Sequence, residues 1–156
     1  MKRRYVLAVI AIFMVLMGTM MNVKWSHMKA DLAGKVFRFH VLANSDREED
    51  QALKMRVKEE ILAYMKQELP TSDSAEITKA WARENLHNIT DRAQQLVKRE
   101  GYDYTVTAKV ASCDFPEKSY GDITFPAGEY EALRIEIGES KGQNWWCVLY
   151  PNLCFI

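Results

Sequence analysis

FRFHVLANSDREED, residues 37–50, decides the fold, because it contains a predicted strand followed directly by the start of a predicted helix. From Phe37 to Val41 apolar residues occupy every second position, a period of two that indicates a strand with one buried face. Ser45 and Glu48 have the spacing of a capping box, and the acidic residues around Glu48 favour the positive end of a helix dipole. We therefore expect a half-buried strand and then a helix with Ser45 as its N-cap.

Two helices are expected after this strand. In the first, apolar residues between Leu53 and Met65 follow a helical period, and Pro70 limits the C-terminal end. The second is expected to begin at Asp73 and to run to Gly101, because its apolar residues also lie on one helical face and glycine often follows a helix. One short turn joins the two helices.

Three further strands are expected in the C-terminal half. The period of two returns in residues 104–110 and 133–137, and residues 144–150 form an apolar run that suits a strand covered on both sides. Residues 116–128 contain the turn residues glycine and proline and are expected to form a loop. Residues 138–142 are expected to form a hairpin loop that joins the last two strands.

The predicted order of elements is β-α-α-β-β-β, and it determines the expected fold class. Two amphipathic helices each need to bury an apolar stripe, and the sheet needs one face covered. We therefore expect an α+β fold with a single two-layer domain. About 130 residues remain after the N-terminal segment, which suits one domain.

A basic and then apolar segment precedes this domain. Residues 2–4 are Lys-Arg-Arg, and the 19 residues from Tyr5 to Val23 carry no charge. At about 1.5 Å per residue such a helix is roughly 28 Å long, close to the roughly 30 Å hydrocarbon core of a bilayer. The positive-inside rule leaves the N-terminus in the cytoplasm and exports the rest of the chain.

Both fates of this segment stay open. Its apolar core suits a signal peptide, but no convincing pair of small residues marks a cleavage site. Residues 1–23 are therefore expected to be a signal peptide or a membrane anchor. Residues 24–34 are expected to be a polar tether, and residues 35–156 the exported domain.

Composition and motifs exclude several classes of function. Residues 24–156 carry 18 Lys and Arg against 21 Asp and Glu, so this part has no basic surface for nucleic acid. The sequence contains no G-x-S-x-G, H-E-x-x-H or C-x-x-C motif. We expect no catalytic residue, no metal site and no cofactor.

Three cysteines, Cys113, Cys147 and Cys154, lie in the part expected to be exported, where disulfides persist. The turn residues at positions 151 and 152 lie between the last two cysteines and would bring their sulfur atoms together. Cys147 and Cys154 are therefore the candidate disulfide pair. The alternative, two buried reduced thiols, stays open.

The pair Trp145-Trp146 is the local feature that most suggests binding. Neighbouring residues of a strand point to opposite faces, so one tryptophan is expected in the core and the other on the surface. Exposed aromatic residues are enriched at protein interfaces. The outward tryptophan therefore suggests a docking surface, while core filling alone explains the other.

Two blocks of the sequence are distinctive. The first is FRFHVLANSD at 37–46 with EDQALK at 49–54, and the second includes FP at 115–116, YG at 120–121, PAGEYEALR at 126–134, NWWCV at 144–148 and LCF at 153–155. These blocks resemble the stage II sporulation protein R family of endospore-forming bacteria. The resemblance runs from about Lys35 to the last residue, and it departs from the family pattern at Asn152, where a proline is expected.

The resemblance implies a signalling protein that is not an enzyme. It would be made in the forespore and exported into the space between the forespore and mother-cell membranes. There it would activate a membrane-embedded aspartic protease, stage II sporulation protein GA, which leads to processing of pro-sigma-E in the mother cell. We expect the contact surface to include Trp145 or Trp146 and the loop around Tyr120 and Tyr130, which is dense in glycine, proline and aromatic residues.

A cell-wall module is the alternative function. Exposed tryptophans would stack on sugars, and hydrolysis would need paired carboxylates. Glu129 and Glu131 are two positions apart on a predicted strand and hence on one face. They are the candidate pair for this alternative.

Overall fold

The computed structural model describes residues 2–69 and 74–155, which fall into two units. One unit extends to Leu32, and the other is a compact domain that begins at Ala33. Pro70 and Asp73, the expected limits of two helices, lie outside the described residues.

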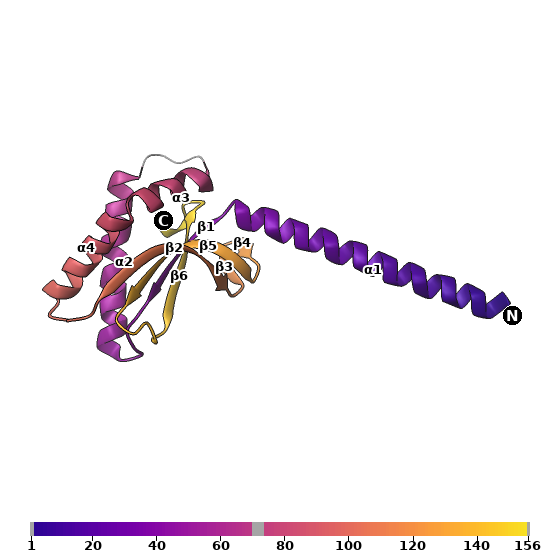
Figure 1. The fold of residues 1–156 in the computed structure, drawn as a ribbon, viewed down its shortest axis with the longest axis horizontal. Coiled ribbons are helices and arrows are strands. Elements are labelled where there is room, and N and C mark those ends of the chain that lie inside the picture. The colour runs from indigo at the N-terminus through magenta and orange to yellow at the C-terminus, as the bar shows by residue number, and fades with distance from the viewer. Residues whose placement is uncertain (1, 70–73, 156) are drawn as a thin grey trace. The chain divides into compact units, whose positions relative to one another are not determined.

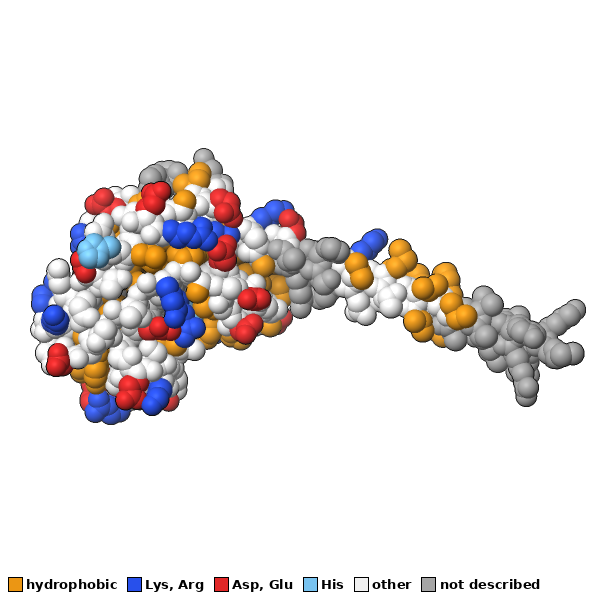
Figure 2. Space-filling model, viewed as in Figure 1, with side chains coloured by type: hydrophobic (Ala, Val, Ile, Leu, Met, Phe, Trp, Pro, Cys, Tyr) orange, Lys and Arg blue, Asp and Glu red, His pale blue; other side chains and the backbone are white. Residues whose placement is uncertain are grey.

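The N-terminal unit is formed by helix α1, Lys2–Gly34, whose last two residues belong to the domain. The helix continues through the residues expected to form a tether. Ile12, Phe13 and Leu16 are among its exposed apolar side chains. Figure 2 shows apolar side chains along the described part of this helix. No helix among the residues that the structure describes is both long enough and apolar enough to cross a membrane.

A mixed four-stranded sheet forms the centre of the domain, in the order β2-β5-β1-β6 (Figure 1). β1, Phe37–Leu42, pairs in parallel with β5, Gly128–Ile137. β6, Asn144–Tyr150, pairs antiparallel with the other side of β1. β2, Val106–Phe115, pairs antiparallel with β5 and forms one edge.

The hairpin expected at residues 138–142 does not form, because β1 lies between β5 and β6. The connection instead crosses the end of β1, where Gly142 N–H donates to the Ala43 carbonyl at 3.0 Å. A Cβ atom on Gly142 would lie 2.2 Å from the Ser45 carbonyl oxygen. The loop between β5 and β6 therefore packs against the backbone of the residues that follow β1. It does not form a tight turn between two paired strands.

Three helices cover one face of the sheet (Figure 1). They are α2, Glu48–Glu68, α3, Ala75–Glu84, and α4, Leu86–Arg99. The apolar side chains of the helices meet those of the strands in one core, confirming an α+β fold. This core includes Phe37, Phe39, Val41, Leu53, Val57, Ile61, Ile89, Val97, Leu133, Ile135 and Leu149.

Helix α2, the first helix of the domain, begins later than expected, so the prediction of Ser45 as its N-cap is wrong. Arg47 occupies the N-cap position of α2. The Ser45 hydroxyl instead donates to the buried carboxylate of Asp50 at 2.5 Å, and Asn44 Nδ2 donates to the same oxygen at 3.0 Å. The polar residues after β1 thus anchor α2 through Asp50 rather than through a capping box.

The second expected helix is two helices, with Asn85 between α3 and α4. Asn85 Nδ2 donates to the Trp81 carbonyl at 2.9 Å, and its Oδ1 accepts from the Tyr64 hydroxyl at 3.2 Å. An asparagine side chain that bonds the backbone competes with helical hydrogen bonding. The N-cap of α3 is Ser74, whose hydroxyl accepts from the Ile77 N–H at 3.3 Å.

Residues 116–128 were expected to form a loop, but they contain a small hairpin. Its strands are β3, Lys118–Tyr120, and β4, Ile123–Phe125, which form a two-stranded sheet of their own. Gly121, at a φ of 59°, lies in the turn between them. A short 3-10 helix, η1, Leu153–Phe155, ends the described chain.

β1 is buried along its whole length, so the expectation of a half-buried strand is also wrong. Arg38 is 0% exposed and His40 is 4% exposed. Both alternate with the core residues Phe37, Phe39 and Val41, and therefore point to the sheet face away from the helices.

Candidate functional site

The candidate site is a cluster of aromatic side chains around Arg38 and His40, on the sheet face opposite the helices. Side chains from all four strands of the main sheet and from the β3–β4 hairpin meet there through ring contacts and cation–π contacts. We call it the aromatic cluster. Its members are Arg38, His40, Phe115, Tyr120, Phe125, Tyr130 and Trp146.

Arg38 lies at the centre of the aromatic cluster and is enclosed by rings. Its guanidinium carbon is 4.0 Å from the centre of the Phe115 ring, 5.1 Å from Tyr130 and 5.9 Å from Phe125. Burial lowers the pKa of Arg38, whereas the neighbouring Tyr120 acts in the opposite direction. The aromatic faces stabilise the cation, but they provide no negative charge.

The hydrogen bonds of Arg38 are few. Nη2 donates to the Tyr120 hydroxyl at 3.4 Å, a long contact. Nε and Nη1 are buried and have no hydrogen-bond partner. Among the residues that the structure describes, no carboxylate forms an ion pair with Arg38. A buried guanidinium without a carboxylate is unusual, because buried charges in proteins are normally paired.

His40 lies next to Arg38 along β1 and is stacked on Trp146. The two ring centres are 4.1 Å apart and the rings are nearly parallel, at 12°. Burial, and then the positive charge of Arg134, lower the pKa of His40 to about 4. The imidazole is therefore neutral at pH 7, which suits its place beside two arginines.

Tyr120 and Tyr130 close two sides of the cluster. The Tyr120 hydroxyl accepts from Arg38 and donates to the Trp146 carbonyl at 3.5 Å. The Tyr130 hydroxyl donates to the Pro126 carbonyl at 2.7 Å, and burial raises its pKa. Tyr130 is 3% exposed, so a partner cannot reach its ring in this conformation.

The structure therefore brings three of the four expected partner-binding residues together, namely Trp146, Tyr120 and Tyr130. Trp145 lies on the other face of the sheet, where its ring meets Phe39 edge to face at a centre distance of 5.7 Å. The two tryptophans point to opposite faces, as the strand pleat requires. Both tryptophans are half-buried: Trp145 packs against the core on the helix side, and Trp146 stacks on His40 on the opposite face.

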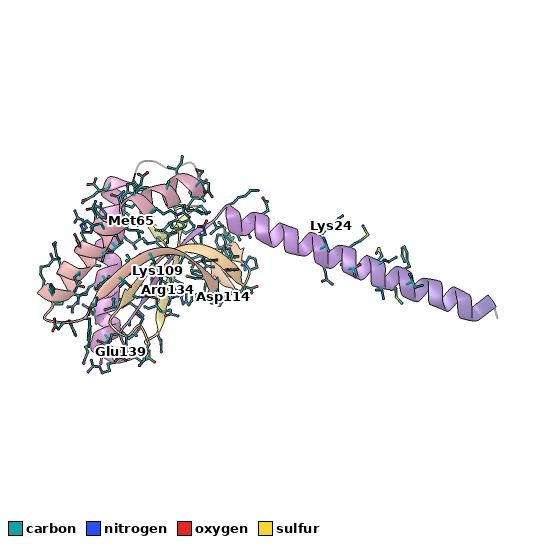
Figure 3. The ribbon with its side chains drawn as sticks, viewed as in Figure 1. Lys24, Met65, Lys109, Asp114, Arg134 and Glu139 are labelled. Atoms are coloured by element: carbon teal, nitrogen blue, oxygen red, sulfur yellow. A yellow bond between two sulfur atoms is a disulfide. The ribbon has the colours of Figure 1, made fainter. Side chains whose placement is uncertain are left out.

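An ion-pair network lies beside the cluster on β2 and β5, where Figure 3 labels Lys109 and Arg134. Glu136 accepts from Lys109 Nζ at 3.2 Å and is 2.7 Å from Arg134 Nε. Burial acts to raise the pKa of Glu136, but its cationic partners outweigh burial and hold that pKa below the usual range. Glu136 therefore neutralises part of the positive charge near His40.

The β3–β4 hairpin supplies the exposed part of this region. Ile123, near the turn, is 47% exposed, and its strand neighbour Tyr120 donates a hydrogen bond to the carbonyl of the half-buried Trp146. Exposed apolar and aromatic side chains are of the kind found in protein interfaces.

Cys147 and Cys154 form a disulfide that ties β6 to η1, with their Cα atoms 5.7 Å apart. Cys147 is buried, on the helix side of β6. Cys113 is free and buried on β2, and its thiol makes a weak contact of 3.7 Å with the Ala111 carbonyl. The disulfide thus fixes the C-terminal end of the described chain to β6, an edge strand of the main sheet.

Of the two carboxylates proposed for the cell-wall alternative, Glu131 is engaged in ion pairs. Glu131 is held by Lys79 Nζ at 2.8 Å and by Arg83 Nη2 at 2.6 Å. The hydrogen bond from Lys79 is the main cause that lowers the pKa of Glu131, which is therefore ionised at neutral pH. An ionised, doubly paired carboxylate is a poor general acid. Among the described residues, no group of three His, Cys, Asp or Glu side chains could hold a metal ion.

Comparison with known proteins shows to which family the chain belongs. The family model for stage II sporulation protein R matches residues 33–156. A Bacillus subtilis (strain 168) protein named stage II sporulation protein R is 31% identical over 161 residues, which cover 99% of this chain and 72% of that protein. The chain belongs to the stage II sporulation protein R family. No solved structure matches.

The region matched by the family begins at residue 33, where the compact domain also begins. The two blocks that carry the family resemblance meet in space, because β1 pairs with both β5 and β6, and the loop between these strands is held at the end of β1. Asn44 Oδ1 accepts from the Glu139 N–H at 2.9 Å, and a Cβ atom on Gly138 would lie 2.3 Å from the same oxygen. The Ala-Asn-Ser-Asp segment therefore has a structural role, which is to join the two halves of the domain.

Sequence reasoning missed Arg38 and His40 as members of the site. The period of two assigned them to a solvent-facing side, because nothing local shows that a strand is central in its sheet.

Proposed function

We propose that this chain is an exported sporulation signal that activates the membrane-embedded aspartic protease stage II sporulation protein GA, leading to processing of pro-sigma-E in the mother cell. Family membership, which itself supports a role in sporulation, carries this proposal. The chain acts by contact with the protease and has no catalytic step of its own.

The location in this proposal is the space between the forespore and mother-cell membranes. The N-terminal segment, with its basic residues before an uncharged stretch, serves as the export signal or as an anchor. The disulfide between Cys147 and Cys154 supports export, because disulfides persist outside the reducing cytoplasm.

Activation by contact requires that the chain binds the active state of the protease more tightly than its resting state. We assign this contact to the exposed surface of the aromatic cluster, which is Trp146 with the β3–β4 hairpin. Ile123 offers the most exposed apolar side chain there, at 47%. Burying such side chains drives association, and aromatic residues dominate the energy of protein interfaces.

Co-expression in cells that do not sporulate tests the proposal. The full chain, the candidate protease and the sigma precursor are produced together, and precursor processing is measured by immunoblot. Processing that depends on the chain is the expected result. Absence of processing, with all three proteins present in the membrane fraction or exported, would contradict the proposed function.

A matched pair of variants tests the surface. Ile123→Ala removes an exposed isoleucine from the hairpin, whereas Ile77→Ala removes one of similar exposure, 49%, from α3. We expect reduced processing with Ile123→Ala and normal processing with Ile77→Ala. Equal processing by both variants would remove the hairpin from the contact surface.

The structure gives the cell-wall alternative less support. Trp145 and Trp146 lie on opposite faces, so they do not form one platform for sugar stacking. Glu131 is engaged by two cations, as described above. Incubation of the chain with peptidoglycan, followed by measurement of bound chain and released fragments, separates the two functions.

A further inference from the structure

The buried charge of Arg38 is the feature that the fold itself does not explain. A fully buried guanidinium loses its hydration, and the ring faces of Phe115, Tyr130 and Phe125 compensate only in part. A methionine or leucine would fill the same space without that cost. A side chain that is costly for folding and lies within a binding surface points to a role in recognition.

Few hydrogen bonds hold the cover over Arg38. β3 and β4 pair with each other and with no strand of the main sheet. Phe125 is 3% exposed and lies 5.9 Å from the Arg38 guanidinium carbon. Among the described residues, the side-chain hydrogen bonds from the hairpin to the main sheet are the two long ones of the Tyr120 hydroxyl, 3.4 Å from Arg38 Nη2 and 3.5 Å to the Trp146 carbonyl. Bonds of this length are weak. The hairpin is therefore the part of the cluster that opens most easily.

The guanidinium geometry shows what opening would release. A carboxylate binds guanidinium through two parallel N–H groups, and Nη2 belongs to both pairs of nitrogens that can present them. Tyr120 engages Nη2, while Nε and Nη1 have no partner. Because Nη2 carries two N–H groups, one on each edge of the guanidinium, Tyr120 occupies only one edge, and its removal frees that edge for a carboxylate.

We infer that the β3–β4 hairpin is a lid over a carboxylate-binding site, in which Arg38 pairs with an acidic side chain of the partner protein once the hairpin lifts. The inference rests on the proposed function and names the chemistry of its contact. An ion pair formed among aromatic walls is shielded from water, which strengthens it. A planar, bidentate carboxylate suits arginine better than lysine.

The processing assay described above tests this site with the full chain. Arg38→Met removes the charge and keeps the volume, and it is expected to lower processing by about tenfold or more, the effect of losing one charged pair. Arg38→Lys keeps the positive charge but lacks the planar pair of N–H donors, so it is expected to recover only part of the processing that Arg38→Met loses. Arg92→Met is the matched control, because Arg92 also lies on a ring, 4.2 Å from Tyr64, but in the helix layer.

Two results separate this inference from its alternatives. Processing by Arg38→Met equal to that of the native chain would overturn the carboxylate site and leave the proposed function intact. No processing even with the native chain would overturn the proposed function instead. Accumulation of each variant, measured by immunoblot, shows whether a loss of processing reflects a loss of folded chain.

Tyr120→Phe keeps the test decisive if Arg38→Met does not fold. It removes the hydroxyl that engages Nη2 and retains the ring, so the lid opens more readily. Half-maximal processing is expected at about threefold less chain, and an unchanged or higher requirement would overturn the lid.

Hydrogen exchange on the chain alone, in detergent micelles, tests the lid without any partner. The amides of residues 118–125 are expected to exchange at least about tenfold faster than those of β5, because local opening exposes them. Equal protection of the two segments would overturn the lid.

Discussion

The stability of the domain is expected to fall between pH 7.5 and pH 5 because of His40. Burial, and then the charge of Arg134, hold the pKa of His40 at about 4 in the folded chain, against 6.5 for an ordinary histidine. Between pH 4 and pH 6.5 the His40 side chain binds a proton in the unfolded chain but not in the folded chain. This contribution to the free energy of unfolding is complete above pH 6.5 and is lost as the pH falls toward 4.

The size of the effect follows from the gap between the two pKa values. At about 1.4 kcal/mol per pKa unit, the full contribution is about 3 kcal/mol, of which about 2 kcal/mol is lost by pH 5. His40→Phe keeps a ring against Trp146 and does not titrate. The native chain should therefore lose about 2 kcal/mol more than the variant between pH 7.5 and pH 5.

Urea unfolding of the full chain in detergent micelles, followed by tryptophan fluorescence, measures this difference at the two pH values. Other titrating groups are common to both chains, so their contributions cancel in the comparison. Nuclear magnetic resonance of the imidazole of His40 gives the pKa directly. Equal losses in the two chains, or a His40 midpoint near 6.5, would refute the reasoning.

Two further predictions concern the connections of β6. Gly142→Ala should lower the free energy of unfolding by about 1–3 kcal/mol, because its Cβ atom would overlap the Ser45 carbonyl, whereas Gly128→Ala meets no atom closer than 3.8 Å and serves as the control in the same urea experiment. Replacing Cys147 and Cys154 together by alanine should cost about 2–3 kcal/mol in the chain-entropy model of a short loop. Reductant should then lower the stability of the native chain and leave that of the double variant unchanged, and a response of both chains would argue against the disulfide as the cause.

The local sequence pattern predicted which segments form helices and strands better than it predicted which strands pair with each other. The strands expected at residues 133–137 and 144–150 lie within β5 and β6, and the strand expected at residues 104–110 overlaps β2, which begins at Val106 and runs to Phe115. The pairing of β6 with β1 instead of β5 was not predicted. Strand order depends on contacts between distant residues, and alternation within one strand carries no information about them.

The helix boundaries that were predicted incorrectly have physical explanations. Asn85 breaks a continuous helical pattern because its amide bonds Trp81 and Tyr64, which no periodicity shows. Ser45 has the spacing of a cap, but the buried carboxylate of Asp50 competes for its hydroxyl.

The candidate site was predicted in part. The pleat correctly separated Trp145 from Trp146, and the glycine-rich loop led to Tyr120 and Tyr130. Arg38 was missed, because its burial depends on a hairpin more than 75 residues later in the chain, as the 82-residue separation of Arg38 and Tyr120 shows.

The central position of β1 has a consequence for when the domain can fold. β1 is the first strand to be synthesised, but both of its neighbours come from the last part of the chain, β5 from Gly128 and β6 from Asn144. A nascent chain that stops before Gly128 leaves both edges of β1 unpaired, so the sheet cannot assemble until nearly the whole polypeptide exists. Contacts of such long sequence separation form slowly. A protein with this topology stays unfolded during synthesis, which is the condition a polypeptide must keep in order to thread through a translocation channel.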